Sequence, residues 1–259
     1  MSRLKGKVAI VTGGGRGIGA GIVRCFLEEE ANVVVAQRSE VAADFEANVT
    51  FVRTDLNSTE SITALAETVT CLHGGVDVLV NNAGVMFERH VRDMTEAEWD
   101  QILAVNLKAP FLLTQAVLAS MEERGGGSII NIGSIEGLAA NPGHTAYSAT
   151  KSGIHGMTRA MAVDLGTSGV RVNAIAPGWI ETDLVKEYVS QISDQEGFGK
   201  QLAELHPLGR AGQPIDIGRT AAFLASDDAA FITGQVIVVD GGRLTQISLP
   251  SSLRELTST

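Results

Sequence analysis

The stretch Lys7-Val-Ala-Ile-Val-Thr-Gly-Gly-Gly-Arg-Gly-Ile-Gly19 decides the fold of this chain. Its β-branched, apolar run 8–11 predicts a short buried strand. Apolar side chains then recur at helical spacing, which predicts a helix from about Gly17; they are Ile18, Ile22, Val23, Phe26 and Leu27. A glycine turn between a strand and a helix N-terminus favours anions, because unpaired N–H groups and the helix dipole point at one place.

Two glycine spacings overlap in this turn. Gly15-x-Gly17-x-x-Ala20 matches the general fingerprint of dinucleotide-binding loops. Thr12-Gly13-x-x-x-Gly17-x-Gly19 spaces its glycines differently. An ordinary flexible turn is the alternative, and the flanking strand and helix make it the weaker one. We therefore expect the turn to bind the pyrophosphate of a dinucleotide.

Composition and charge limit the other possibilities. The chain has 259 residues, of which 44% are hydrophobic, so we expect one domain with one large core over residues 1–242. The net charge is −10 and no lysine or arginine cluster stands out, which argues against a nucleic-acid partner. We see no apolar signal region and no stretch long enough to span a bilayer, so we expect a cytoplasmic protein without a membrane partner.

The cysteines and histidines do not suggest a metal site. Cys25 and Cys71 lie on predicted helix faces, where we expect buried small hydrophobes rather than a disulfide or a metal pair. The five histidines show no ligand spacing, so no metal is expected.

Seven apolar runs alternate with helical patterns along the chain; they are 8–11, 32–36, 49–53, 76–80, 129–132, 170–175 and 235–239. Near-continuous Val and Ile runs between helices are typical of a parallel sheet covered on both faces. The sequence therefore predicts an α/β, doubly wound Rossmann-type fold with a seven-stranded parallel sheet. Such sheets bind ligands at the carboxyl ends of their strands.

The end of the second strand bears on the choice of cofactor. A site that prefers NAD usually places a carboxylate there, for the ribose 2′-hydroxyl. This chain has Gln37 instead, followed by Arg38, and Arg16 lies in the glycine turn. Two guanidinium groups near the ribose favour a 2′-phosphate, so we expect NADP(H) over NAD(H). The alternative is that Arg38 is a solvated loop charge.

Polar residues also follow the third and fourth strands. Asp55 could accept a hydrogen bond from the adenine amino group or cap the next helix, and Asn57 with Glu60 also resembles a cap. Asn81-Asn82-Ala83-Gly84 ends the fourth strand with small and amide residues. These suit the close approach of a cofactor ribose, and they also suit an ordinary turn.

A long helix follows the fourth strand. Thr95 and Glu98 form a capping box at its start, and Pro110 falls inside it. Proline has no N–H, so the carbonyl of Asn106, four residues earlier, loses its helical donor. We expect a kink at Asn106, with a carbonyl free to hold a water.

Tyr147 and Lys151 lie four residues apart and therefore share one face of a helix. A lysine ammonium ~4 Å from the phenol would favour tyrosinate by roughly 4 kcal/mol before desolvation. Burial opposes this shift, so we expect a phenol pKa only moderately nearer neutrality, suited to general acid–base catalysis. A purely structural role is the usual alternative for such a pair.

Taken together, the motifs resemble the short-chain dehydrogenase/reductase family over about residues 4–242. They are Thr12 to Gly19, Asp55-Leu56, Asn81 to Gly84, Asn106, Ser134, Tyr147-x-x-x-Lys151 and Pro177-Gly178-Trp-Ile180-x-Thr182, in family order. The resemblance implies a nicotinamide-dependent oxidoreductase that interconverts a secondary alcohol and a ketone. Gly15 departs from the pattern, since the family often has Ser, Ala or Thr there.

The resemblance also implies site residues and an assembly. The implied catalytic residues are Asn106, Ser134, Tyr147 and Lys151. The implied cofactor-binding residues are Gly13, Gly15, Arg16, Gly17, Ile18, Gly19, Arg38, Asp55, Leu56, Asn82, Ala83, Gly84, Tyr147, Lys151, Pro177, Gly178, Ile180 and Thr182. Family members often pair through the helices that hold Asn106 and Tyr147, so a homodimer or homotetramer is expected.

The substrate is the least determined feature of the sequence. Residues 183–206 read as a substrate lid, with surface packing as the alternative, and 243–259 form a polar tail. Glu136, His144 and Trp179 are expected to face the pocket, which suits hydroxyl-bearing substrates such as sugars or polyols. The choice within the family lies among a 3-oxoacyl thioester reductase, a sugar or polyol dehydrogenase and a steroid-like alcohol dehydrogenase. A non-catalytic dinucleotide-binding regulator is the alternative from a different class.

Overall fold

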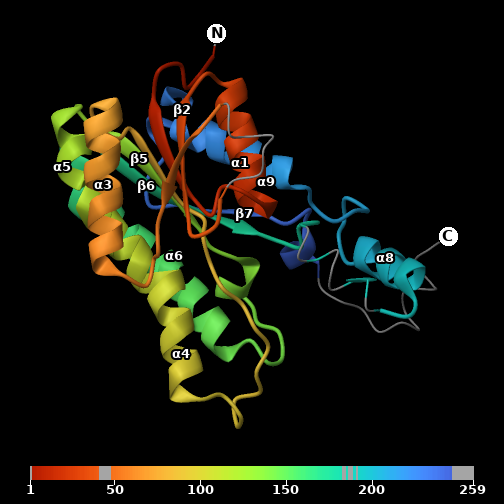
Figure 1. Ribbon diagram of the computed structural model, residues 1–259. Coiled ribbons are helices and arrows are strands. Elements are labelled where there is room, and N and C mark those ends of the chain that lie inside the picture. The colour runs from red at the N-terminus through yellow and green to blue at the C-terminus, as the bar shows by residue number, and fades with distance from the viewer. Residues whose placement is uncertain (1, 41–47, 183–184, 186–188, 191, 247–259) are drawn as a thin grey trace.

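The structure of the protein is a computed structural model that describes residues 2–40, 48–182, 185, 189–190 and 192–246 (Figure 1). Its centre is one seven-stranded parallel sheet in the order β3-β2-β1-β4-β5-β6-β7. The strands are β1 (Val8–Thr12), β2 (Asn32–Gln37), β3 (Thr50–Arg53), β4 (Val78–Asn81), β5 (Gly127–Ile132), β6 (Val170–Pro177) and β7 (Val236–Val239). Each predicted apolar run became one strand, so the predicted sheet and fold class are confirmed.

Helices cover both faces of the sheet (Figure 1). Alternating residues of each strand point to opposite faces, so neighbours in β2 join different cores. Val33 and Val35 pack with α1 (Gly17–Glu28) and α9 (Pro214–Ala225). Val34 packs on the other face with α3, α5 and α6. The helices of that face are α3 (Thr59–His73), α5 (Ala109–Glu123) and α6 (Thr145–Leu165), and α4 (Glu96–Leu103) precedes α5 and contacts α6.

The contact between α1 and α9 is close because glycine lies on both sides of it. A Cβ placed on Gly21 would lie 2.4 Å from the carbonyl oxygen of Pro214. A Cβ on Gly218 would lie 2.4 Å from the carbonyl oxygen of Gly21. The two helices therefore meet backbone to backbone, and a larger residue at either glycine would force them apart.

Helices α4 and α5 are joined without a loop by a π-helical turn, Ala104–Lys108. The N–H of Ala109 donates to the carbonyl of Ala104, five residues back. Pro110 leaves the carbonyl of Asn106 without an α-helical donor, and a π turn is how this helix continues past it. The predicted irregularity at Asn106 and the predicted capping box at Thr95 are both confirmed.

One sequence prediction about this helix was wrong. Among the described residues, the continuous helix Glu96–Glu123 is long and apolar enough to cross a membrane by length and composition. Leu113, Val117 and Met121 are fully buried and pack on the sheet, so this face of the helix belongs to the core.

The start of α3 and the two cysteines give further corrections. Ser58, rather than Asn57, caps α3, because its hydroxyl accepts from the N–H of Ser61. Cys25 is buried as predicted, whereas Cys71 is exposed on the outer face of α3. Residues 41–47, between β2 and β3, lie outside the described residues.

The shorter elements complete the described chain. They are the 3-10 turns η2 (Ile135–Gly137), η3 (Gly166–Ser168), η4 (Asp227–Ala229) and η5 (Arg243–Thr245), and α8 (Gln195–Glu204) in the region of the expected lid. Of the remaining lid, residues 183–184, 186–188 and 191 are outside the described part, as is the tail from 247.

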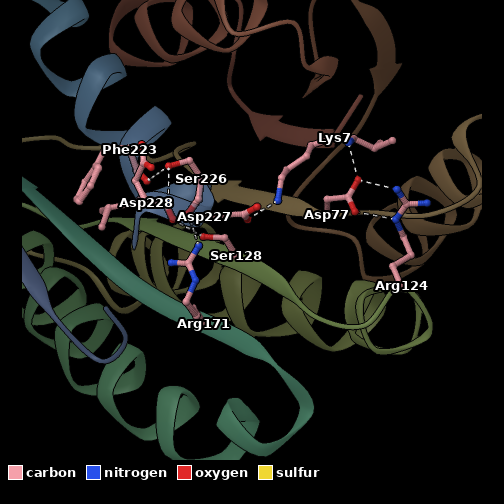
Figure 2. Close-up of polar contacts among 11 residues, drawn as sticks. Lys7, Asp77, Arg124, Ser128, Arg171, Phe223, Ser226, Asp227 and Asp228 are labelled. Atoms are coloured by element: carbon pink, nitrogen blue, oxygen red, sulfur yellow. Dashed lines mark hydrogen bonds and ion pairs between the residues drawn. The ribbon is translucent and has the colours of Figure 1, made fainter. Parts of the chain in front are cut away.

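Ion pairs tie together the segments at the amino ends of the strands (Figure 2). Arg124 donates two hydrogen bonds of 2.8 Å to the carboxylate of Asp77, which also accepts from the N–H of Val8 at 2.7 Å. Nearby, Lys7 pairs with Asp227 at 2.9 Å. The side chain of Asp77 is only 18% exposed, whereas that of Asp227 is 89% exposed. The two pairs should therefore differ strongly in their contribution to stability.

We expect Asp77→Ala to lower the free energy of unfolding by about 2 kcal/mol, since it leaves a guanidinium and a strand N–H without their acceptor. Asp227→Ala is the matched control. We expect it to lower the free energy of unfolding by about 0.5 kcal/mol, because the Lys7–Asp227 pair is exposed to solvent. Urea denaturation of both variants checks this. Equal losses would show that burial does not separate the two pairs.

Candidate active site

The glycine turn after β1 has the geometry of an anion site. Gly13 and Gly17 adopt φ values of +64° and +53°, a region that side chains other than glycine rarely adopt. Arg16 is the extended N-cap of α1, and no described side chain caps the helix or places a carboxylate in its first turn. The first N–H groups of α1 thus remain for a ligand, and the site fits a dinucleotide phosphate.

A single buried hydroxyl holds this turn to the loop after β4. Thr12 Oγ1 accepts from the N–H groups of Asn82 and Ala83, each at 3.0 Å. The side-chain amide of Asn82 in turn donates to the carbonyls of Thr12 and Gly13 at 2.8 and 3.2 Å. Asn82 therefore supports the glycine turn directly. Thr12 was not predicted as a site residue by itself, although a hydroxyl residue directly after the apolar run 8–11 could have indicated one.

The expected ribose end of the site lies at the ends of β2 and β3. Gln37 Oε1 accepts from the N–H of Gly15 at 2.9 Å, so Gln37 closes onto the glycine turn. Arg16 and Arg38 are both exposed. Asp55 does not cap α3; its carboxylate accepts from the N–H and side chain of Asn57, which lowers its pKa, with a smaller contribution from Arg38.

The loop after β6 closes the site from the other side. Pro177 ends β6, the N–H of Gly178 donates to Val239, and Ile180 is buried beside Gly212. A Cβ placed on Gly17 would lie 3.2 Å from Thr182 Cγ2, so this loop reaches the glycine turn.

Trp179 of the same loop contacts α8. Its ring meets that of Phe198 edge to face, with centroids 5.9 Å apart. The loop after β6 thus connects the sheet edge with α8 of the expected lid region.

The four expected catalytic residues come together near Gly84. A Cβ on Gly84 would lie 3.3 Å from Asn106 Oδ1 and 3.8 Å from Lys151 Nζ. Lys151 Nζ lies 5.4 Å from the centre of the Tyr147 ring and donates to the carbonyl of Ile132 at 2.8 Å.

Asn106 and Ser134 are held by main-chain bonds. Asn106 exchanges two 2.8 Å hydrogen bonds with the backbone of Val85, which fixes the loop after β4. Ser134 Oγ accepts from the N–H of Glu136 at 3.0 Å, so its own proton remains available for another acceptor. Ser134 also interacts with Tyr147.

The proton affinities differ from the sequence prediction. Burial, with a smaller contribution from the charge of Glu136, raises the pKa of Tyr147 to about 12 against the opposing effect of a hydrogen bond from Ser134. Burial lowers the pKa of Lys151 to about 8. The expected shift of the phenol toward neutrality was therefore wrong for this arrangement. Desolvation dominates, and the ammonium is bonded to Ile132 rather than to the phenol.

His155 is a buried residue that the sequence analysis missed. His155 follows Lys151 by four residues, as Lys151 follows Tyr147, so it lies one helical turn beyond the lysine on the same face of α6. A Cβ on Gly133 would lie 2.4 Å from its Nε2, and a Cβ on Gly137 would lie 2.4 Å from its Cε1. Burial lowers the pKa of His155, which favours a neutral ring. The ring thus packs against both glycines that bracket the turn of Ser134.

The fold and this site together define a dinucleotide-dependent oxidoreductase, and similarity to known proteins gives the family. A family profile described as "Enoyl-(Acyl carrier protein) reductase" matches residues 13–243. A 3-oxoacyl-[acyl-carrier-protein] reductase FabG of Vibrio cholerae is 41% identical, over 92% of this chain and 98% of its own. A 3-alpha-(or 20-beta)-hydroxysteroid dehydrogenase of Mycobacterium bovis is 40% identical, over 95% and 92%.

A solved structure agrees with these relatives. The aldohexose dehydrogenase of Thermoplasma acidophilum superimposes with a TM-score of 0.90 at 31% identity, covering 96% of this chain and 99% of its own. The chain belongs to the short-chain dehydrogenase/reductase family. It is an enzyme that uses a nicotinamide dinucleotide to interconvert CH–OH and ketone groups.

Proposed function

We propose that this enzyme works with NADP(H) and that Tyr147 is its general acid and base. The observation that supports the proposal is the convergence of Asn106, Lys151 and Tyr147 with Ser134 at the carboxyl edge of the sheet. When bound, the dinucleotide supplies or accepts the hydride, and the protein contributes position and electrostatics.

Each of the four side chains has a role that follows from its bonds. Ser134 polarises the substrate oxygen by donating to it the proton that it donates to Tyr147 in the free enzyme, while its own oxygen accepts from the N–H of Glu136. Tyr147 gives that oxygen a proton during reduction and removes it during oxidation. Lys151 exchanges its hydrogen bond to the carbonyl of Ile132 for one to the nicotinamide ribose, and so positions the cofactor beside Tyr147. Asn106 holds the adjacent loop, and its main-chain carbonyl holds a water that links Lys151 to solvent.

The preference for NADP(H) rests on the ribose end of the site. The side chain of Gln37 is neutral and accepts a hydrogen bond from the N–H of Gly15, whereas Arg16 and Arg38 are exposed cations. A 2′-phosphate would bind between these guanidinium groups. The rest of the cofactor would lie along the residues named above, from Ile18 and the glycine turn to Leu56 and Thr182.

The test is a panel of ketones and secondary alcohols, followed by nicotinamide absorbance with both cofactors. We expect kcat/KM to be at least tenfold higher with NADPH than with NADH. Arg38→Ala should reduce this ratio about tenfold through the KM for NADPH, as one charge-assisted contact is lost. A wild-type preference for NADH would contradict the proposed cofactor. Binding without turnover on any substrate would favour a regulator instead.

The candidate substrates are those considered from the sequence, and the activity of one relative supports each. A thioester reductase is supported by FabG of Vibrio cholerae, a sugar dehydrogenase by the structural neighbour, and a steroid-like alcohol dehydrogenase by the mycobacterial relative. The panel therefore includes a 3-oxoacyl thioester, aldohexoses and a hydroxysteroid.

We further propose a single cytoplasmic domain over 1–242, with 183–206 as the substrate lid and 243–259 as a tail. We propose a homodimer or homotetramer that binds a small alcohol or ketone and neither nucleic acid nor membrane. Phe111, which is partly exposed on α5, is consistent with a partner on this helix. Light scattering of the purified protein distinguishes a monomer from these assemblies.

A further inference from the structure

The side-chain amide of Asn106 has a further bonding partner on α6. The N–H of Val85 donates to its Oδ1, and its Nδ2 donates to the carbonyl of Val85, which fixes the orientation of the amide. The second hydrogen of Nδ2 is donated to Thr150 Oγ1 at 3.4 Å. Asn106 and Thr150 are only 2% and 0% exposed, so this hydroxyl takes the place that water would have as the acceptor.

The hydroxyl of Thr150 is itself held in one direction. It donates to the carbonyl of Tyr147 at 2.7 Å, three residues earlier in α6. Because its single proton is used there, its oxygen acts towards Asn106 only as an acceptor. The amide of Asn106 is thus linked through one hydroxyl to the backbone of Tyr147.

The π-helical turn 104–108 also packs directly on α6. A Cβ placed on Gly153 would lie 3.0 Å from Leu107 Cδ2, so the helix and the turn are in close apolar contact. Within the part of the chain that the structure describes, the bond between Thr150 and Asn106 is the only hydrogen bond between this turn and α6. An apolar contact has no preferred direction, whereas a hydrogen bond has one. The hydroxyl is therefore the group that orients the turn relative to Tyr147.

We propose that Thr150 is a positioning residue of the active site, which sets where the main-chain carbonyl of Asn106 lies relative to Lys151. This inference rests on the proposed function, in which that carbonyl holds the water that links Lys151 to solvent. The carbonyl belongs to the same residue whose side chain Thr150 holds, so a rotation of the turn moves both. In this role Thr150 contacts neither substrate nor cofactor and acts through Asn106.

Thr150→Val tests the proposal, because it keeps the branched shape of the side chain and removes the hydroxyl. The substrate is the member of the panel above with the highest wild-type kcat/KM. We expect kcat to fall about tenfold, since a misplacement of about 1 Å in a supporting group can cost up to ~100-fold in rate. KM and the Kd for NADPH should each stay within about threefold of wild type, because no group that contacts a ligand is changed.

Two further variants separate the hydroxyl from the shape of the side chain. Thr150→Ser keeps the hydroxyl and should have a kcat within about twofold of wild type. Thr150→Ala removes the hydroxyl without placing a methyl group against Asn106, and should lose kcat to the same extent as the valine variant.

Thr158→Val is the matched control on the same helix. Thr158 is also fully buried, and its hydroxyl accepts from the side-chain amide of Asn131 at 2.9 Å. The control therefore leaves the same chemical group, a buried asparagine amide, without its acceptor, but in β5 rather than in the π-helical turn. Its Tm should fall at least as far as that of Thr150→Val, whereas kcat should stay within about twofold of wild type.

Hydrogen exchange of the protein without cofactor gives a readout that does not depend on turnover. The N–H of Val85 donates to Asn106, so it should exchange faster when the amide of Asn106 is loosened. We expect exchange at Val85 and in 104–108 to be at least about threefold faster in Thr150→Val. Thr150→Ser and Thr158→Val should exchange these amides at the wild-type rate.

The outcomes separate this inference from the proposed function. The inference is overturned by a kcat of Thr150→Val within about twofold of wild type, by an equal loss of kcat in Thr158→Val, by a serine variant as slow as the valine variant, or by unchanged exchange. In each of these cases, loss of turnover in Tyr147→Phe would still support the proposed function. A wild-type protein without turnover on the whole panel would count against the proposed function and, with it, against this inference.

Discussion

Tyr147→Phe is expected to lower kcat by about a thousandfold while the Kd for NADPH changes less than about threefold. The hydroxyl is the only group removed, and a positioned general acid or base contributes about 10²- to 10⁴-fold to the rate. The ring remains in place between His144 and Lys151, so the fold and the cofactor cleft should persist. Stopped-flow turnover and NADPH fluorescence titration measure the two quantities.

Ser152→Ala is a useful control for that variant, because it removes a hydroxyl from an exposed position on the same helix. Its hydroxyl donates to the carbonyl of Gly137 at 3.1 Å, which lies away from the phenol, so we expect kcat within about twofold of wild type. Near-normal turnover by Tyr147→Phe would show that another group moves the proton.

Gly19→Ala is expected to weaken NADPH binding by more than about a hundredfold. A Cβ at Gly19 would lie 2.2 Å from the carbonyl oxygen of Gly13 and 2.6 Å from Asn82 Nδ2. The oxygen belongs to the backbone of the same turn, so it can move only if the phosphate-binding loop moves. Fluorescence titration gives the affinity, and a thermal melt shows whether the fold survives.

Gly15→Ala is the matched substitution in the same loop. Its Cβ would also come too close to an atom, at 2.6 Å, but that atom is the side-chain amide of Gln37. A side chain can rotate away, so the expected loss of NADPH affinity is about tenfold or less. If both variants lost affinity equally, the distinction between backbone and side-chain obstruction would be wrong.

The parts of the site that are close in sequence were predictable. The glycine turn lies within one strand–helix unit, and Tyr147 and Lys151 lie one helical turn apart, so local periodicity alone places them. The irregularity at Asn106, which the structure shows as a π-helical turn, followed from the missing N–H of Pro110 four residues later. The seven strands were predictable for a similar reason, because a strand buried on both faces is apolar along its whole length.

The parts that depend on distant segments were not predictable. The hydrogen bonds of Thr12 join the ends of β1 and β4, and Glu88, which lies near His144, was not among the residues expected at the pocket. The high pKa of Tyr147 depends on its burial and on where the lysine bonds, neither of which spacing gives. Cys71 was expected to be buried but is exposed, because the composition of α3 is compatible with either of two faces packing on the core.

The backbone contact between α1 and α9 has a consequence for how the chain is made. Gly21 is translated well before Pro214 and Gly218, which lie 193 (214 − 21) and 197 (218 − 21) residues further along the chain. The side of α1 that packs on α9 therefore stays uncovered while the residues between them are made. Native contacts of such long sequence separation form slowly, and during that interval the exposed apolar side of α1 is open to chaperones and to aggregation.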